Sequence, residues 1–417
     1  MPPLTLNNVG ANDRFDQNSR NFAVFTHNII EITDRLNLTL GLRYTNERKT
    51  LDATLTDNNI FCRAIAGSPF AALAQLPCVV PSVPGGSFSQ DNIRNKEDEL
   101  SGTAVLSFKP TDDLLTYVSY SRGYKAGGFN LDRSALLRTG GFGPVAGTAT
   151  LEDLIFEPEK VDAFEIGAKY DGRGFDLNVA AFHQVFDGFQ LNTFNGLFFE
   201  VENVNACKQD LGGADTDNDP TTGACPGGTK GGVKSMGVEV EAFLQPMEDI
   251  DVNLGATVVD TQYRENLVGI DGRPLSNALF QLPGRRISNS SLWTLTGAFT
   301  YTPPIGGSGL SGLFYIDGRY QSEFNTGSDL DLEKMQDDYF VVNGRIGLRG
   351  PDDRWGIELW GRNLFDENYQ QVAFDAPIQG SGTIRGVEQG FYPRATQLFG
   401  SFLAEPRTYG VTVRTRF

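Results

Sequence analysis

The chain has 417 residues, of which 40% are hydrophobic, and it contains 48 glycines and 30 phenylalanines but only four methionines and two histidines. This composition favours a glycine- and aromatic-rich β protein over a helical enzyme, and the absence of any apolar run of about 18 residues excludes a membrane-spanning helix. The formal net charge of −17 argues against a nucleic-acid partner, because a phosphate-binding surface needs clustered Lys and Arg.

The first strand pair shows the pattern on which the fold prediction rests. In "RLNLTLGLRYT" (35–45) every second residue is apolar, from Leu36 to Tyr44, and the residues between them are polar or glycine. Successive side chains of a strand point to opposite faces, so this stretch predicts a strand with one apolar and one polar face. It pairs with 20–32 across "ITDR". Residues 1–19 are expected to precede the sheet as an extracellular loop segment.

The same pattern recurs in pairs along the whole chain, and each pair is joined by a short connector rich in Gly, Pro or Asp. The predicted strands are, in order, 20–32 and 35–49, 98–109 and 113–124, 159–170 and 174–187, 233–246 and 250–264, 290–302 and 310–322, 336–349 and 354–364, and a final strand, 405–417. The loops between pairs are long: 50–97, 125–158, 188–232, 265–289, 323–335 and 365–404.

Short turns at one end and long loops at the other are typical of a transmembrane barrel, which has tight periplasmic turns and extended extracellular loops. A ten-residue strand spans roughly 33 Å, and at a tilt near 45° it covers the ~25 Å apolar band of an outer membrane. The sequence therefore predicts strands that cross a membrane.

The two faces of the strands differ in charge. Residues such as Ile166, Val240, Leu254 and Val411 make one face apolar. The opposite face carries Glu165, Lys169, Asp176, Asn178, Glu239, Glu241, Asp251, Asn253, Asp317, Arg319, Asn343, Arg345, Glu358, Arg362, Arg414 and Arg416. A soluble one-sided sheet would show the same split, but it would need a second layer, and nothing in the chain reads as covering helices. We predict an all-β fold, an antiparallel transmembrane β-barrel with the polar face in the lumen.

The strand count is thirteen, whereas bacterial single-chain barrels have even strand numbers. The segment 1–20 also lacks the basic and apolar regions of a secretory signal. We therefore expect the chain to be the C-terminal part of a longer protein. The alternative is that one strand pair has been misread.

The four cysteines fall into two local pairs, Cys62 with Cys78 and Cys207 with Cys225, each within one predicted loop. Such pairs favour disulfides formed in an oxidising compartment. Four free thiols are the alternative, and metal binding is less favoured because neither pair has CxxC spacing and no His lies nearby.

Five motifs in order resemble the C-terminal barrel half of TonB-dependent outer-membrane receptors. They are "LLTYVSYSRGYKAGGFN" (114–130), "FEPEKVDAFEIGAKY" (156–170), "SMGVEVEAFLQP" (235–246), "GRNLFDENYQ" (361–370) and "PRTYGVTVRTRF" (406–417). The resemblance covers about residue 20 to Phe417, and the terminal Phe417 looks like the signal read by the barrel assembly machinery. It implies a barrel of about 22 strands in the outer membrane of a Gram-negative bacterium.

The resemblance also implies how such a protein works. A plug domain carries the TonB box, couples the receptor to the TonB energy-transducing complex, and lets a large scarce nutrient enter, with a ferric siderophore as the first choice and cobalamin or a glycan as alternatives. The plug, the TonB box and the first barrel strands are not in this sequence, and a passive outer-membrane pore is the rival function. A smaller departure is "LPGRRISNSSLW" (282–293), where Arg285 and Arg286 follow the Leu-Pro.

Aromatic and basic side chains at the extracellular mouth are the predicted ligand contacts, because rings stack on ligands and guanidinium pairs with carboxylates or catecholates. The candidates are Arg122, Tyr124, Lys125, Phe129, Phe189, Phe194, Tyr263, Arg285, Arg286, Phe324 and Tyr369. The alternative is that the rings form an interfacial girdle and the Arg residues meet lipopolysaccharide phosphates. The lumen charges Glu165, Glu239, Glu241 and Arg345 would face the plug or water.

No catalytic, metal or cofactor site is predicted. "DTDNDPTTG" (215–223) spaces three Asp residues as a calcium loop does, but it lacks the Gly and the bidentate Glu of that loop, so a solvated acidic loop is favoured. His27 and His183 sit within strands, and no nucleophile, zinc or phosphate-loop motif occurs.

Overall fold

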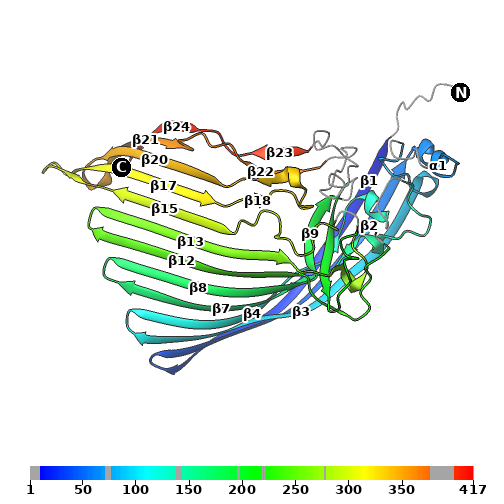
Figure 1. Ribbon diagram of the computed structural model, residues 1–417, viewed down its shortest axis with the longest axis horizontal. Helices are drawn as coiled ribbons and strands as arrows, with labels where there is room; N and C mark the ends of the chain where they lie inside the picture. The colour runs from blue at the N-terminus through cyan, green and yellow to red at the C-terminus, as the bar shows by residue number, and fades with distance from the viewer. Residues whose placement is uncertain are drawn as a thin grey trace.

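The computed structural model describes residues 10–70, 77–137, 143–194, 198–217, 219, 221–276, 279–375 and 399–416. Thirteen antiparallel strands pair in succession in one curved sheet, and the short β16 (Pro304–Ile305) joins the same sheet beside β17 (Figure 1). They are β1 (Ala11–Thr33), β2 (Leu36–Asp57), β3 (Ser87–Thr111), β4 (Leu114–Lys125), β7 (Glu159–Gly172), β8 (Phe175–Asp187), β12 (Val233–Met247), β13 (Ile250–Tyr263), β15 (Trp293–Tyr301), β17 (Leu310–Gln321), β20 (Tyr339–Arg349), β21 (Trp355–Arg362) and β24 (Thr408–Thr415). The thirteen predicted strands and their order are confirmed.

The remaining described elements are short and lie mainly in the loops. The strands are β5 (Gly128–Phe129), β6 (Ile155–Phe156), β9 (Phe189–Phe194), β10 (Phe199–Cys207), β11 (Thr229–Gly231), β14 (Leu267–Gly269), β16 (Pro304–Ile305), β18 (Phe324–Asn325), β19 (Met335–Gln336), β22 (Gln370–Phe374) and β23 (Gly400–Leu403). The helical segments are α1 (Ile60–Ala66) and the 3₁₀ turns η2 (Pro84–Gly86), η3 (Arg133–Leu136), η4 (Leu151–Leu154), η5 (Ile270–Gly272), η6 (Leu332–Lys334) and η7 (Pro351–Asp353). Among the described residues, no helix is long and apolar enough to cross a membrane.

Short turns gather at one end of the sheet and long loops at the other, as the sequence predicts (Figure 1). The tight turn between β7 and β8 requires glycine at position 174, where φ is +74° and an added Cβ would come within 2.8 Å of the Gln245 carbonyl oxygen. L-residues rarely adopt that conformation. This end of the sheet is therefore specified by local turn chemistry.

The first hairpin is longer than predicted. Residues 11–19 pair with 49–57 as part of β1 and β2, so the predicted loop at 1–19 is wrong for 11–19, and residues 1–9 lie outside the described part. Likewise β3 begins at Ser87, which shortens the loop 50–97 to 58–86. The sequence prediction ended these strands too early because the apolar positions of β2 change from even-numbered to odd-numbered residues. Leu51, Ala53 and Leu55 are apolar on the inner face, where loops bury them. That the extended part stands outside the membrane stays a prediction.

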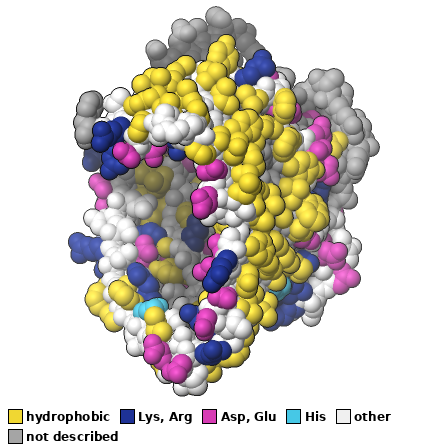
Figure 2. Space-filling view, turned by 90° about the vertical axis from the view of Figure 1, so that its left-hand side faces the viewer, with side chains coloured by type: hydrophobic (Ala, Val, Ile, Leu, Met, Phe, Trp, Pro, Cys, Tyr) yellow, Lys and Arg dark blue, Asp and Glu magenta, His cyan; other side chains and the backbone are white. Residues whose placement is uncertain are grey.

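The apolar face of the sheet is exposed, whereas the polar face lines a hollow. Leu254 is 51% exposed, and Leu42, Ile166 and Val413 are similarly open to the surroundings. In the end-on view from the turn side, hydrophobic side chains cover the outer surface and charged side chains line the hollow (Figure 2). Exposed apolar side chains over so large an area match the lipid face of a barrel rather than a protein surface in water.

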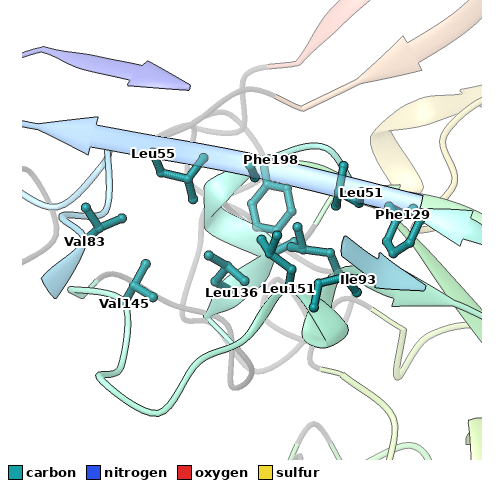
Figure 3. Packing of buried hydrophobic residues seen from close by; sticks show 12 residues of the cluster. Leu51, Leu55, Val83, Ile93, Phe129, Leu136, Val145, Leu151 and Phe198 are labelled. Carbon is teal, nitrogen blue, oxygen red and sulfur yellow. The ribbon is translucent and has the colours of Figure 1, made fainter. Parts of the chain in front are cut away.

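Two hydrophobic cores hold the long loops above the inner face of the sheet. In the first core, Leu51 and Leu55 of β2 pack with Phe129, Leu136, Leu151 and Phe198 (Figure 3). The second core lies around Tyr263, Leu267 and Leu282. Burial of each such side chain stabilises the loops by roughly 1.5–3 kcal/mol before entropy is counted. The loops are thus packed structures and not free chains.

The structure joins Cys62 to Cys78 and Cys207 to Cys225. Cys62, Cys78 and Cys207 are buried within the loops.

We expect a peptide map of the purified protein, made without reductant and with free thiols blocked, to contain two linked pairs, one for each predicted bond. Each pair should separate when a reductant is added. Blocked thiols at Cys62 and Cys78 in the unreduced sample would contradict the first bond.

Candidate functional site

Three of the predicted mouth residues come together in one small cavity. Arg285, Arg286 and Phe324 line a cavity of about 120 Å³ at the loop end of the sheet, together with Glu323 and Asn325. Arg286 Nε is 3.4 Å from Asp260 Oδ1, while Arg285 is exposed. The cavity therefore offers one guanidinium that is already paired and one that faces solvent.

A second cavity, of about 530 Å³, lies beside the first on the inner face of the sheet. Tyr339 and Tyr369 line it with rings stacked at a centroid distance of 4.0 Å, and Arg319 and Tyr315 lie deeper along β17. Phe324 lies 6.4 Å from Tyr339, ring centre to ring centre, so a row of three rings connects the two cavities. Flat aromatic surfaces beside guanidinium groups suit a ligand that carries both rings and negative charge.

Arg122 lies on the opposite side of the wall. It shares a face of β4 with the exposed Val118 and Tyr120, and its Nη1 is 3.3 Å from Asp162 Oδ1. The Tyr120 hydroxyl donates to the same carboxylate at 2.6 Å. This placement favours contact with lipopolysaccharide phosphates for Arg122. The neighbouring candidates Tyr124, half-buried, and Lys125, exposed, end the same strand.

Four aromatic candidates are part of the loop packing in this structure. Phe129 and Phe194 are buried, Tyr263 is 1% exposed, and Phe189 contacts Tyr263 edge to face at 6.2 Å. The rings of Phe129, Phe194 and Tyr263 are covered by other loop residues, so in this structure they pack the mouth, whereas Phe189 is half-buried. The role of these four residues as ligand contacts stays a prediction.

The structure also reveals a buried ion cluster that the sequence did not indicate. Arg133, 2% exposed, donates to both carboxylate oxygens of Asp13 at 3.0 Å and to Asp57 at 3.3 Å. It also donates to the backbone carbonyls of Thr56 and Pro81. A single side chain therefore ties the loop after β4 to the ends of β1 and β2.

A second ion cluster joins three loop segments next to the mouth. The Lys334 ammonium contacts Asp329 and Asp375, and it lies 3.9 Å from Asp331, which accepts a hydrogen bond from Gln281 at 2.7 Å. In the described part of the chain, Asp329, Asp331 and Asp375 are the acidic group close enough to bind a metal ion. The Lys334 ammonium lies among these three carboxylates, where a metal ion would otherwise bind. We therefore assign the four side chains the role of holding the loop segments together and call them the clasp.

The charges of this clasp depend on pH. Burial, followed by the charge of Asp329, raises the pKa of Asp331 to about 8, and burial with a hydrogen bond to Asp329 raises the pKa of Asp375 to about 7. Burial opposes ionisation of Asp329 as well, but its bonds to Asp375 and Lys334 leave its pKa lowered. Asp331 and Asp375 therefore keep their protons to a higher pH than an exposed aspartate does.

The backbone of the loop that carries the clasp should become less protected from hydrogen exchange as the pH rises. The raised pKa values mean that the folded loop binds more protons than the unfolded loop, so the stabilisation is complete below the ordinary pKa near 4 and is lost as the pH rises through 7 to 8. Each proton contributes up to about 1.4 kcal/mol per pH unit. We expect hydrogen exchange at 324–335 to quicken, after correction for the intrinsic rate, between pH 5.5 and 8.5. The Asp331→Asn variant should weaken this dependence, and equal dependence in both proteins would contradict it.

The acidic loop at 215–223 is satisfied by protein donors in its described residues. Asp215 accepts from the Leu267 backbone N–H at 3.1 Å, and Asp217 and Asp219 accept from the Thr222 and Thr221 hydroxyls. Asp217 and Asp219 are exposed and bond within the loop, whereas Asp215 is buried and bonds to a residue 52 positions away, so the solvated-loop interpretation fits the first two only. Residues 218 and 220 lie outside the described part, as does Phe417, the predicted assembly signal.

Two signals in the sequence could have pointed to residues that were missed. Tyr339 begins a strand whose inner face continues through Asn343 and Arg345, so its orientation follows from alternation. "SDLDLEK" (328–334) alternates acidic and apolar residues, which is unusual for a solvated loop. Arg133 carries no such signal, because its partners lie 120 and 76 residues away.

Comparisons with known proteins give a consistent picture. A family model described as "TonB dependent receptor-like, beta-barrel" matches residues 2–364. The ferric-pyoverdine M114 receptor PbuA of Pseudomonas sp. (strain M114) is 22% identical over 78% of this chain and 31% of its own length. The probable TonB-dependent siderophore receptor PiuA of Acinetobacter baumannii is 22% identical over 69% of this chain and 31% of its own length.

Solved structures agree on the fold. The ferric yersiniabactin uptake receptor FyuA from Yersinia pestis superposes with a TM-score of 0.66 at 16% identity, covering 98% of this chain and 47% of that receptor. At this level of identity the likeness shows the fold alone. The chain spans about a third of the length of the two curated relatives described above.

Proposed function

The chain belongs to the TonB dependent receptor-like β-barrel family, and from that premise we propose that it forms the C-terminal part of a receptor that imports a ferric siderophore. Members of the family are outer-membrane proteins of Gram-negative bacteria, and they are transporters, not enzymes. A barrel of about 22 strands, a plug in the lumen and energy supplied by TonB are parts of the same proposal, with the strands from β1 onward as part of the barrel wall.

The paired cavities at the loop end carry this proposal. Arg285, Arg286 and Phe324 line one cavity, and the stacked Tyr339 and Tyr369 line the other. Ferric siderophores expose aromatic or carboxylate groups around the metal, and guanidinium forks and flat rings complement both. Relatives named as pyoverdine and siderophore receptors support the same ligand class.

Gene deletion with radioiron uptake tests the proposal. A strain without the gene should lose energy-dependent uptake of at least one ferric siderophore from a panel that includes catecholate, hydroxamate and carboxylate chelates, and the restored gene should recover it. Unchanged uptake of every chelate would contradict the proposed ligand class. Uptake that persists after the proton-motive force is collapsed would favour the rival, a passive pore.

Removing the two arginines of the smaller cavity should weaken ligand capture. We expect Arg285→Ala with Arg286→Ala to reduce binding of the imported chelate to de-energised cells by about tenfold or more, because one charge-assisted hydrogen bond contributes about 1.5–3 kcal/mol. Arg122→Ala is the matched control, since its side chain lies on the outer face. Equal binding by both variants would remove this cavity from the ligand site.

A further inference from the structure

Four neighbouring strands at the C-terminal side of the sheet carry an excess of arginine on their inner face. The residues that alternate with the exposed Phe314, Ile346, Leu359 and Val411 face the hollow. Among these inward residues of β17, β20, β21 and β24 are five arginines and two carboxylates. They are Arg319, Arg345, Arg349, Arg362 and Arg414, with Asp317 and Glu358. The local excess is three positive charges in a chain whose net charge is −17.

Strand register places these arginines in successive rows along the wall. On β20, Arg349 lies opposite Ser311 near the turn end, Arg345 lies opposite Tyr315, and Val341, nearer the mouth, lies opposite Arg319. On the other side of β20, Gly356 pairs with both Arg349 and Arg414, which puts those two arginines in one row. The rows from 341 to 349 extend about 26 Å along the strand, comparable to the ~25 Å apolar band of an outer membrane.

Arg345, Arg349 and Arg414, the three arginines nearest to Glu358, surround this one buried carboxylate but do not form hydrogen bonds with it. Glu358, with a side chain 5% exposed, lies 3.9 Å from Arg345 Nη1, 3.9 Å from Arg349 Nη2 and 4.0 Å from Arg414 Nη1. These separations are too long for hydrogen bonds. In the described part of the chain, the guanidinium groups of Arg349 and Arg414 have no closer acceptor, and the Arg414 side chain is 66% exposed. Within the described part of the chain, the N–H groups of Arg349 and Arg414 therefore lack a hydrogen-bond acceptor.

Aromatic rings lie between the arginines. The Arg345 guanidinium carbon is 4.4 Å from the centre of the Tyr315 ring, and that of Arg362 is 5.5 Å from the Trp360 ring. The ring contacts fix the orientation of these guanidinium groups while their remaining edges face the hollow. The 530 Å³ cavity at Tyr315 and Arg319 lies at the mouth end of the same rows.

We infer that these five arginines form a ladder that passes an anionic ferric chelate from the mouth cavity toward the turn end of the lumen. This inference rests on the proposed import function and names its substrate class: a chelate whose carboxylate or catecholate oxygens leave it negatively charged. Rows of Arg select anions in pores, and several weak sites in succession let a ligand enter and leave. A neutral chelate would gain nothing from such a wall.

The experiment uses the full gene product that contains this chain, in the outer membrane of iron-starved cells, and two radioiron probes. One probe is the anionic tris-catecholate complex of ferric ion, and the other is a neutral ferric trihydroxamate. The ladder variant is Arg345→Gln, Arg349→Gln and Arg414→Gln. The matched control, Arg43→Gln, Lys109→Gln and Lys169→Gln, removes three cations from β2, β3 and β7, on the same polar face. Immunoblots of outer-membrane fractions normalise the amounts.

We expect the wild type to import the anionic probe in preference to the neutral one. The ladder variant should lose about tenfold in energy-dependent uptake of the anionic probe, the factor that corresponds to one charge-assisted contact. Its binding of that probe to de-energised cells should be unchanged, and the control should keep full uptake. A variant with lysine at 345, 349 and 414 keeps the charges and should recover most of the uptake.

Each other result has a definite meaning. Import of the neutral probe alone by the wild type overturns the ladder, as does equal loss in the ladder and control variants or no loss in either. Equal loss of both probes in the ladder variant alone shows that the arginines seat an acidic polypeptide and not the chelate. Identical uptake of both probes by the wild-type and deletion strains overturns the ladder before any arginine is changed, whereas the proposed function is overturned only when every chelate of the wider panel gives that result.

Discussion

Replacing Arg133 with methionine will release the loop between β4 and β7 from the sheet. Arg133 is buried against Asp13 and Asp57, and the Asp57 side chain is fully buried. Removal of one partner from a buried ion pair costs about 3–5 kcal/mol, because an uncompensated charge stays behind. Methionine keeps much of the volume, so lost charge and not a cavity causes the effect. We expect hydrogen exchange at 143–158 to accelerate by the corresponding factor of 10² or more, on the order of tenfold per 1.4 kcal/mol.

Arg35→Met is the control for this prediction. Arg35 pairs with Asp112 at the turn end, where the two side chains are 53% and 95% exposed. Exposed pairs contribute little to stability, so exchange at the loop should be unchanged in this variant. Unchanged exchange in Arg133→Met as well would mean that the hydrophobic core around Leu151 and Leu55 holds the loop without the ion cluster.

The sheet could be predicted from the sequence because the two faces of every strand meet different surroundings, lipid on one side and the lumen on the other. Lipid excludes charge from one side chain in two, as in the run from Leu36 to Tyr44, and the lumen accepts charge on the alternate positions. The alternation that results is local and needs no knowledge of tertiary contacts. Turn residues such as Gly174 add a second local signal, so strand order and pairing follow.

The ends of the strands were harder to predict because the surroundings change there. Beyond Tyr44 the apolar positions of β2 move to the opposite parity, at Leu51, Ala53 and Leu55, since the inner face is now covered by loops. A change of parity within one strand looks like the end of a strand when a single apolar face is assumed. The sequence shows that the apolar residues change from one face to the other, but it does not show that loops cover the inner face there.

The mouth could not be predicted residue by residue, since its contacts join distant segments. Phe129 and Tyr263 have the residue types expected of ligand contacts, yet neighbouring loops bury them. The Lys334 clasp brings Gln281 and Asp375 together from separate loops. In the arginine ladder each side chain was placed on the polar face by alternation, but the convergence on Glu358 depends on the register between strands.

A charge on the outer face should prevent assembly, whereas the same charge one residue away should not. Leu254 lies within β13 and is exposed on the apolar face, and Asn253, the residue before it in the strand, points to the opposite, inner face by alternation. Arginine at the lipid face costs about 2–4 kcal/mol near the membrane midplane and much less in an aqueous lumen. We expect Leu254→Arg in the full protein to deplete the folded, heat-modifiable form from outer-membrane fractions.

Asn253→Arg should assemble at wild-type levels, because its side chain enters the hollow beside Glu241. The two variants share the added residue and differ by one position in the chain, so general effects of arginine on synthesis or export cancel in the comparison. Equal assembly of both would mean that the apolar face does not meet lipid. Depletion of Asn253→Arg with normal Leu254→Arg would reverse the two faces, and with them the inward orientation on which the mouth cavities and the arginine ladder depend.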